Sequence, residues 1–298
     1  MPSNHTLDGG KNENPLLVYN RKSFAGMMNH LSRQSIIALD TESDSLFRYY
    51  PKVCLIQITS FADPLVPDPR QVVDYLVDPL RCPEVKLLEL ILADPAIEKI
   101  IHAAENDMVT LQRSYGFTFQ NIFDTQLAAW ILGWPRVGLA AILEEQFGVI
   151  SDKRMQRTDW GKRPLTPQQI AYAQMDTHYL PALQQVLVAE LQARGRWEEA
   201  REAFSQLSRL RPDSRNDATR SFWQMKGVRD LPTSLLGPLA ALWSWREAEA
   251  QRKDLPPFKI LNDDVLIALA QQRPNSLAKL QETRGVSTQL ASAQGAAL

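Results

Sequence analysis

The 298-residue chain has few of the residues that build disulfide scaffolds and transition-metal sites. Its cysteines are Cys54 and Cys82 alone, which excludes a disulfide framework and a four-thiolate zinc site. Its four histidines show no metal-ligand spacing such as His-Glu-x-x-His. No apolar run approaches the roughly 18 residues of a membrane-spanning helix. The first residues also lack the basic and apolar regions of a secretory signal, so we expect a cytoplasmic protein.

Neither sign of charge dominates, because 33 Lys and Arg stand against 34 Asp and Glu, a formal net charge of −1. This balance excludes a wholly basic binder of the histone kind. It does not exclude nucleic acid as a partner, because a balanced total can conceal segregated charge. Residues 194–229 illustrate this, since they carry nine basic and five acidic side chains.

The length is typical of about two domains. We expect a flexible arm at 1–15, a first domain at 16–200, a basic helical connector at 201–230 and an all-helical domain at 231–298. In the first domain, short runs rich in β-branched residues alternate with helical patterns, which is typical of an α/β fold. The expected strands lie at 36–39, 53–59, 72–77, 99–102 and near 122.

Acidic residues follow two of these expected strands. Asp40 and Glu42 are two positions apart, so on a strand both carboxylates face the same side. Two buried carboxylates are costly without a cation, and a hard divalent ion satisfies them. Taken alone, however, the pair fits a polar surface turn with two solvated acids better. Asp107 falls in the first turn of the next expected helix, where an acid often serves only the helix dipole.

A later helix carries a phenol and a carboxylate on one face. Thr166 and Gln169 predict its start through a capping box, and Pro181 is expected to kink or break it. Tyr172 and Asp176 lie four residues apart, so both side chains point in the same direction. By itself this pattern is better explained by a tyrosine that packs on the core beside a solvated aspartate.

Together these residues resemble the four acids and the tyrosine of the tyrosine subtype of DEDD exonucleases: Asp40, Glu42, Asp107, Tyr172 and Asp176. Over about residues 20–200 the chain is also similar to the ribonuclease D signature, through Leu55-Ile56-Gln57, Phe123-Asp124-Thr125-Gln126, Arg157-Thr158-Asp159-Trp160 and Arg163-Pro164-Leu165-Thr166. The segment at about 231–290 resembles an HRDC domain, with Trp245-Arg246 and Asp254-Leu255-Pro256 among its cues. The resemblance implies a ribonuclease H-like mixed five-stranded sheet flanked by helices, followed by a small all-α HRDC-like bundle.

The resemblance further implies a metal-dependent 3′–5′ exoribonuclease that releases nucleoside 5′-monophosphates, with tRNA precursors and other structured RNAs as expected substrates. Its cofactors are expected to be two divalent metal ions, Mg²⁺ or Mn²⁺. Asp40 is expected to bridge them, while Asp107 helps to hold one ion. Glu42 and Asp176 are expected to hold the ion that activates water. Tyr172 is expected to orient that water, because a phenol that titrates near pH 10 is a poor base at neutral pH.

Five further residues are candidates for substrate binding: Gln57, His102, Arg157, Lys162 and Arg163. The basic ones flank the expected site and can contact phosphates, and a solvated loop is the less favoured alternative. A histidine at a strand end is more often a satisfied core residue.

RNA is the expected partner, single-stranded DNA is a second candidate, and neither a membrane nor an obligatory protein partner is expected. Two other functions stay open at this point. One is a DNA 3′–5′ exonuclease in repair, because the same acids cut either polymer. The other is a catalytically inactive nucleic-acid-binding adaptor, against which the four acids and the tyrosine argue.

Overall fold

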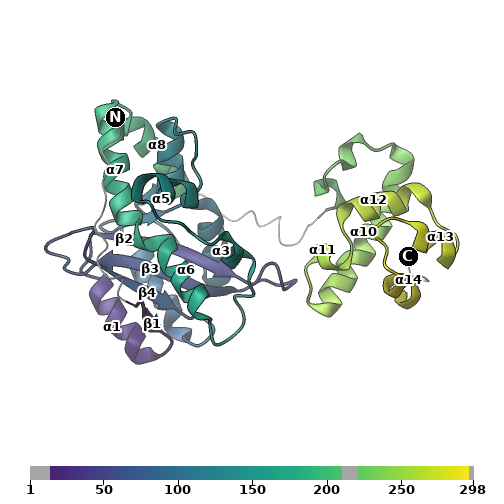
Figure 1. Ribbon diagram of the computed structural model, residues 1–298, viewed down its shortest axis with the longest axis horizontal. Helices are drawn as coiled ribbons and strands as arrows, with labels where there is room; N and C mark the ends of the chain where they lie inside the picture. Colours follow the sequence, from purple (N-terminus) through teal and green to yellow (C-terminus); the bar gives the residue numbers. More distant parts are fainter. Residues whose placement is uncertain (1–13, 210–220, 295–298) are drawn as a thin grey trace. The chain divides into compact units, whose positions relative to one another are not determined.

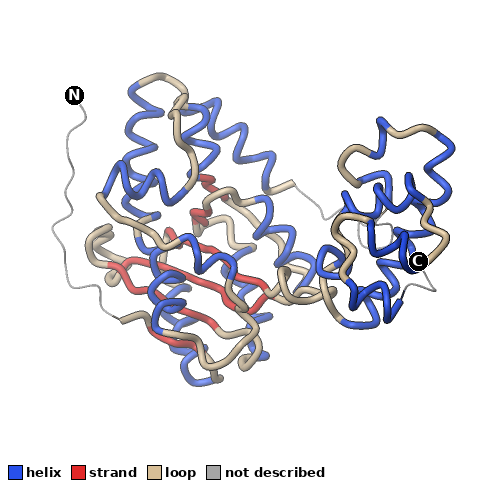
Figure 2. Tube along the Cα trace, turned by 45° about the vertical axis from the view of Figure 1, so that its right-hand side comes forward, coloured by secondary structure: helices blue, strands red, loops and turns tan. Residues whose placement is uncertain are grey.

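The computed structural model describes residues 14–209 and 221–294. It contains two compact units, and each is described by itself. The strands in the described residues all lie in the first unit, and the second consists of helices and loops (Figure 2). An α/β part and an all-α part are therefore confirmed. Across these two described ranges, no helix is long and apolar enough to cross a membrane.

A mixed six-stranded sheet forms the centre of the first unit, in the order β1-β4-β3-β2-β5-β6 (Figure 1). Strands β2, β3 and β4 pair antiparallel, and the other neighbours pair parallel. The strands are β1 (Leu16–Val18), β2 (Ile36–Ser43), β3 (Val53–Phe61), β4 (Val72–Val77), β5 (Glu98–Ile101) and β6 (Ile122–Asp124).

The expected number of five strands is wrong, because β1 is a sixth strand that no local pattern indicates. This strand has three residues, and a segment that short shows no usable alternation. It lies at the edge of the sheet, where it pairs with β4 and leaves Leu16 and Leu17 exposed. Tertiary pairing rather than local pattern therefore makes this segment a strand.

Helices cover both faces of the sheet, because alternate residues of β2 enter two different cores. Ile37 and Leu39 pack with one set of helices and Ala38 with another. The first face carries α1 (Arg21–Leu31), η1 (Pro83–Leu88), α2 (Glu89–Leu92) and α3 (Glu105–Tyr115). The second face carries α4 (Thr125–Ile131), α5 (Leu139–Phe147), α6 (Pro167–His178) and α7 (Leu180–Ala193).

The helix ends follow the local signals in the sequence. Gly116 ends α3 in the left-handed conformation, with a φ of 79° that a side chain would disfavour. The capping box between Thr166 and Gln169 is present at the start of α6. Helix α6 ends at His178, and Pro181 lies in the first turn of the next helix. The break that Pro181 predicts is therefore confirmed.

Helix α8 (Trp197–Leu207) packs on the second face of the sheet. Its Ala200 and Phe204 are buried, and the Phe204 ring lies 4.8 Å from that of Phe123 on β6. The boundary predicted at residue 200 thus falls inside this helix, and Phe204 beyond it packs on the sheet. Most of the predicted arm, and residues 210–220 of the predicted connector, lie outside the described residues.

The second unit is a small helical bundle. Its elements are η3 (Phe222–Gln224), η4 (Val228–Asp230), α10 (Thr233–Lys253), α11 (Pro257–Ile260), α12 (Asp263–Gln272), α13 (Leu277–Glu282) and α14 (Thr288–Gln294). The buried guanidinium of Arg246 joins two of them, because it lies 2.6 Å from Asp263 and donates to the Leu261 carbonyl. The all-helical character predicted for this part of the chain is confirmed over its described residues.

Candidate metal centre

Three carboxylates from two elements meet at one place in the first unit. Asp40 and Glu42 lie two positions apart on β2, so both side chains point to the same face of the sheet, which α6 covers. Asp176 comes from α6. One ligand oxygen from each of these three lies within 4.8 Å of the other two. Residues 134 positions apart in sequence are thus brought within reach of a single ion.

Asp107 completes the acidic group from the opposite side. It lies in the first turn of α3 and accepts a hydrogen bond from the Thr41 hydroxyl. The four acids line one cavity of about 500 Å³. Its other lining residues include Thr41, His102, Asn106, Lys153, Gln156 and Tyr172. We call this the acidic cavity.

Burial and mutual repulsion disfavour the charged forms of these acids. Burial raises the pKa of Asp40 well above its ordinary value, and the carboxylates of Asp107, Asp176 and Glu42 add to the effect. The same causes raise the pKa of Glu42 to about 9. Burial likewise raises the pKa of Asp176 to about 8 and that of Asp107 to about 6. Each acid therefore disfavours the charged form of its neighbours, an effect that a bound cation would reverse.

The donor set fits a hard divalent cation. All close ligand atoms are carboxylate oxygens, which suit Mg²⁺ or Mn²⁺ better than the softer metals that prefer thiolate or imidazole. A cation would also offset the repulsion among the carboxylates, because its positive charge attracts each of them. It would therefore lower the pKa values that this repulsion raises. The residues present thus match an oxygen-bound divalent metal in both chemistry and charge.

Tyr172 stands beside the acids as a hydrogen-bond donor. Its ring packs against the buried Trp160, with 6.2 Å between ring centroids. A hydrogen bond between Tyr172 and Asp176 lowers the pKa of that carboxyl, against the effect of burial. Burial and the neighbouring carboxylates raise the pKa of the Tyr172 phenol above its ordinary 10. The phenol therefore keeps its proton at neutral pH and donates it in a hydrogen bond.

A buried polar network fixes α6 over the sheet. Asp74 of β4 is 5% exposed and accepts three hydrogen bonds. The donors are the hydroxyl of Thr59 at 2.6 Å, the amide of Gln174 at 2.7 Å and Nδ1 of His178 at 2.7 Å. The Thr59 hydroxyl also lies 2.8 Å from that of Thr177. We call these residues the Asp74 network, and they flank Asp176 on its helix.

Comparison with known proteins agrees with this geometry. Residues 16–192 match a family model described as 3′-5′ exonuclease, and residues 236–298 match the HRDC domain. A ribonuclease D of Gluconacetobacter diazotrophicus is 31% identical over 277 residues, which are 92% of this chain and 67% of that protein. The chain belongs to the ribonuclease D family of 3′–5′ exoribonucleases.

Solved structures support the ribonuclease D assignment. The crystal structure of Escherichia coli RNase D, an exoribonuclease involved in structured RNA processing, matches with a TM-score of 0.71 and 30% identity. The match covers 95% of this chain and 73% of that one. The catalytic core of RRP6 from Trypanosoma brucei shares the fold, with a TM-score of 0.74 at 24% identity and coverage of 97% and 80%. The chain spans about two thirds of the length of the curated ribonuclease D proteins it matches.

Two of the residues that the ribonuclease D resemblance suggested for substrate binding lie at the acidic cavity or beneath it. His102 lines the cavity, its Nδ1 lies 2.9 Å from the Thr125 hydroxyl, and burial lowers its pKa to about 4. It is thus neutral at physiological pH. Gln57 pairs with Asp40 across β2 and β3 and is fully buried. Within the described residues, neither polar atom of its side chain has a hydrogen-bond partner.

The three basic candidates are separated by the structure. Arg163 lies in an ion pair with Asp78 at 2.6 Å and donates to the Cys54 carbonyl at 2.6 Å. Its guanidinium therefore holds the loop before α6 to the sheet and does not face the acidic cavity. Arg157 ends the helical turn η2 (Lys153–Arg157) and is exposed, as is Lys162.

Sequence reasoning missed Thr41, Gln156 and the Asp74 network. Thr41 carried a usable signal, because it stands between two candidate acids. Asp74 also carried one, since an aspartate inside the apolar run Val72–Val77 needs buried partners. Gln156 had no such signal, because only the folded η2 segment brings it to the cavity wall.

Proposed function

We propose that Asp40, Glu42, Asp107 and Asp176 hold two divalent cations, Mg²⁺ or Mn²⁺, and that the protein removes nucleoside 5′-monophosphates from RNA 3′ ends. The observation that carries this proposal is the approach of three carboxylates to within 4.8 Å in a cavity that Asp107 also lines. A bound cation offsets both the burial cost of these acids and the repulsion between them. The family membership supports the same reaction.

When held by these carboxylates, divalent cations would supply positive charge at the scissile phosphate and would lower the pKa of a nearby water. The side chains do the rest. The four carboxylates fix where that charge lies, and Thr41 restrains Asp107 by its hydrogen bond. The Tyr172 phenol keeps its proton, so it orients the attacking water by hydrogen bonding and does not act as the base. Gln57 lies opposite Asp40 on the neighbouring strand, so its amide can reach that carboxylate or a bound water.

Exposed basic residues next to the cavity suit a polyanionic substrate. Lys153 lines the cavity, and Arg157 and Lys162 follow it on the exposed segment before α6. Such residues position a phosphate backbone without reading its sequence. We therefore keep Arg157 and Lys162 as substrate contacts and leave out Arg163, whose guanidinium is occupied by Asp78. We assign tRNA precursors and other structured RNAs as substrates, and a cytoplasmic location stays a prediction.

A 3′-extended tRNA precursor and a matched single-stranded DNA, each with Mg²⁺ or Mn²⁺, test the proposal. We expect stepwise shortening of the RNA to a defined end and release of 5′-monophosphates. Asp40→Asn abolishes this, whereas Glu105→Gln, an exposed acid in the same turn as Asp107, leaves the rate unchanged. Faster trimming of DNA would instead indicate a repair nuclease. Binding without cleavage of either polymer would indicate an adaptor.

A further inference from the structure

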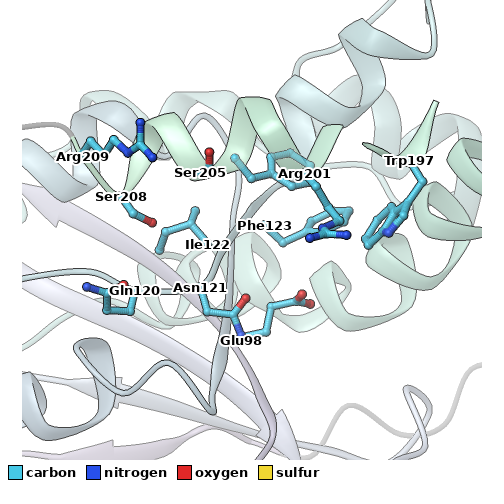
Figure 3. Close-up of a pocket in the computed structure, with 11 residues that line it drawn as sticks. Glu98, Gln120, Asn121, Ile122, Phe123, Trp197, Arg201, Ser205, Ser208 and Arg209 are labelled. Atoms are coloured by element: carbon cyan, nitrogen blue, oxygen red, sulfur yellow. The ribbon is translucent and has the colours of Figure 1, made fainter. Parts of the chain in front are cut away.

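A second cavity of about 630 Å³ lies in the first unit, away from the acidic cavity. It opens between α8 and the amino-terminal ends of β5 and β6, where Glu98 and Ile122 begin their strands (Figure 3). His102 and Asp107 follow the opposite, carboxyl-terminal end of β5. The two cavities share no lining residue. We call this one the α8 cavity.

One face of α8 provides an aromatic ring, hydroxyls and positive charge. Trp197, Arg201 and Ser205 follow each other at intervals of four residues, so they line one face, and Arg209 extends this row (Figure 3). Arg209 itself lies two residues past the end of α8, in the turn where its amide donates to the Gln206 carbonyl. Arg201 pairs with Glu198 at 3.0 Å, but both side chains are more than half exposed. Such a pair contributes little, so the guanidinium is available to a ligand.

The opposite wall is polar at its edge and apolar at its floor. The carboxylate of Glu98 accepts a hydrogen bond of 2.8 Å from Gln184, which fixes one of its oxygens. Asn121 is held by its own hydrogen bond of 3.1 Å to the Pro95 carbonyl. Ile122 and Phe123 are buried and form the floor. Figure 3 shows Glu98 on the side of Trp197 and Arg201, with Arg209 at the other end of the row.

This arrangement selects among ligand classes. A cation would be repelled by the two arginines, and an apolar ligand would leave the charge of the arginines unpaired. A purely anionic ligand would be repelled by Glu98. The walls instead match a ligand with an aromatic ring that carries amino groups at one end and an anion at the other. A volume of about 630 Å³ is in the ordinary range for small-molecule pockets.

We propose that the α8 cavity binds a nucleotide unit, with its base against Trp197 and Glu98, its phosphate toward Arg209, and Arg201 between the two. Aromatic side chains stack on bases of any identity. A carboxylate accepts hydrogen bonds from the exocyclic amino group of a base, and guanidinium groups bind phosphate in a forked geometry. The unit is either a free nucleotide or one residue of an RNA chain, since both present the same groups. This site goes beyond the proposed hydrolysis and does not depend on it.

Binding to the full chain in EDTA tests the proposal, because without cations the acidic cavity repels phosphate. The probes are AMP, GMP and a fluorescent ten-residue oligoadenylate, followed by equilibrium dialysis and anisotropy. We expect Arg201→Glu and Arg209→Glu each to weaken binding at least tenfold. The matched control is Arg33→Glu, which makes the same charge change at an exposed residue just past the end of α1, on the other face of the sheet. Trp197→Phe keeps a ring and retains most of the affinity.

The outcomes separate the two sources of the ligand. Weaker binding of AMP or GMP to the arginine variants identifies a free nucleotide as ligand. Weaker binding of the oligonucleotide alone identifies an RNA chain. Equal loss in Arg33→Glu, or no loss in either arginine variant, overturns the proposal. Hydrolysis of a dinucleotide with Mg²⁺ is expected to be unchanged in Arg201→Glu, so failure of this site is distinguishable from failure of the proposed reaction.

Discussion

Helix α6 lies between two acidic sites that differ in how their charge is balanced. On one side Asp74 accepts hydrogen bonds from Thr59, Gln174 and His178. On the other side the charges nearest to Asp40 are carboxylates, and they raise its pKa further. A buried acid that the protein supplies with donors stabilises the fold. A buried acid that the protein surrounds with like charge marks a place for a cation that the chain does not encode.

The two sites are coupled because they use the same short helix. Tyr172 and Asp176 belong to the acidic cavity, whereas Gln174, Thr177 and His178 belong to the Asp74 network. The network thus sets the position of α6 on β3 and β4, and through it the position of Asp176. Substitutions in the acidic cavity and in the Asp74 network should therefore differ in their effects: the former should lower activity without lowering stability, and the latter should lower both.

The largest expected effect is on catalysis. Asp176→Asn removes one member of the acidic group, so we expect hydrolysis of RNA to fall by about a thousandfold, as loss of a key electrostatic group does elsewhere. Without metal the same change should raise the free energy of unfolding by about 1 kcal/mol, because it relieves repulsion between buried charges. Urea unfolding in EDTA and single-turnover hydrolysis measure both. A variant that loses stability without metal would contradict the comparison.

The opposite combination is expected for the network. Asp74→Ala leaves three buried donors without their acceptor, which should lower the free energy of unfolding by about 3 kcal/mol. Asp74→Asn keeps an acceptor oxygen and should recover much of this loss. At a temperature where all variants are folded, kcat should fall in Asp74→Ala and be rescued in Asp74→Asn, while KM stays constant. An unchanged kcat in Asp74→Ala would show that the network does not position Asp176.

Divalent metal should stabilise the folded chain by binding at the acidic cavity and not at the Asp74 network. A ligand at a hundred times its Kd adds about 2.7 kcal/mol to the free energy of unfolding. We expect Mg²⁺ or Mn²⁺ to raise Tm in the wild-type chain and in Asp74→Asn, but much less in Asp176→Asn. Thermal scans with and without EDTA measure this. An equal rise in all three proteins would place the bound metal away from the acidic cavity.

The sequence predicts local features of this arrangement better than distant ones. The alternation of β2 is enough to place Asp40 and Glu42 on one face, and a four-residue spacing joins Tyr172 to Asp176. Their union with Asp107 came from the family resemblance, because no local pattern records which strand and helix meet. The same limit explains why Arg163 was assigned to phosphate binding. Its actual partner, Asp78, lies 85 residues away in the sequence, so no local pattern reveals the ion pair. Strand β1 and the packing of α8 were missed for this reason too.

The smallest expected effect concerns a buried ammonium whose hydrogen bonds go to backbone carbonyls, which is a third case beside the two sites. Lys99 of β5 is fully buried, its ammonium donates to the carbonyls of Asp94 and Ile97, and burial lowers its pKa to about 8. The folded chain therefore releases this proton at lower pH than the unfolded chain, whose lysine titrates near 10.4. The burial cost is present below pH 8 and is lost as pH rises toward 10.4, so stability should increase across that window. We expect Lys99→Met to abolish about 2 kcal/mol of this increase. Urea unfolding between pH 7 and 10 measures this increase in stability. The matched control is Lys86→Met, which removes an exposed lysine. An identical pH profile in wild type and Lys99→Met would show that two carbonyls suffice to balance a buried ammonium.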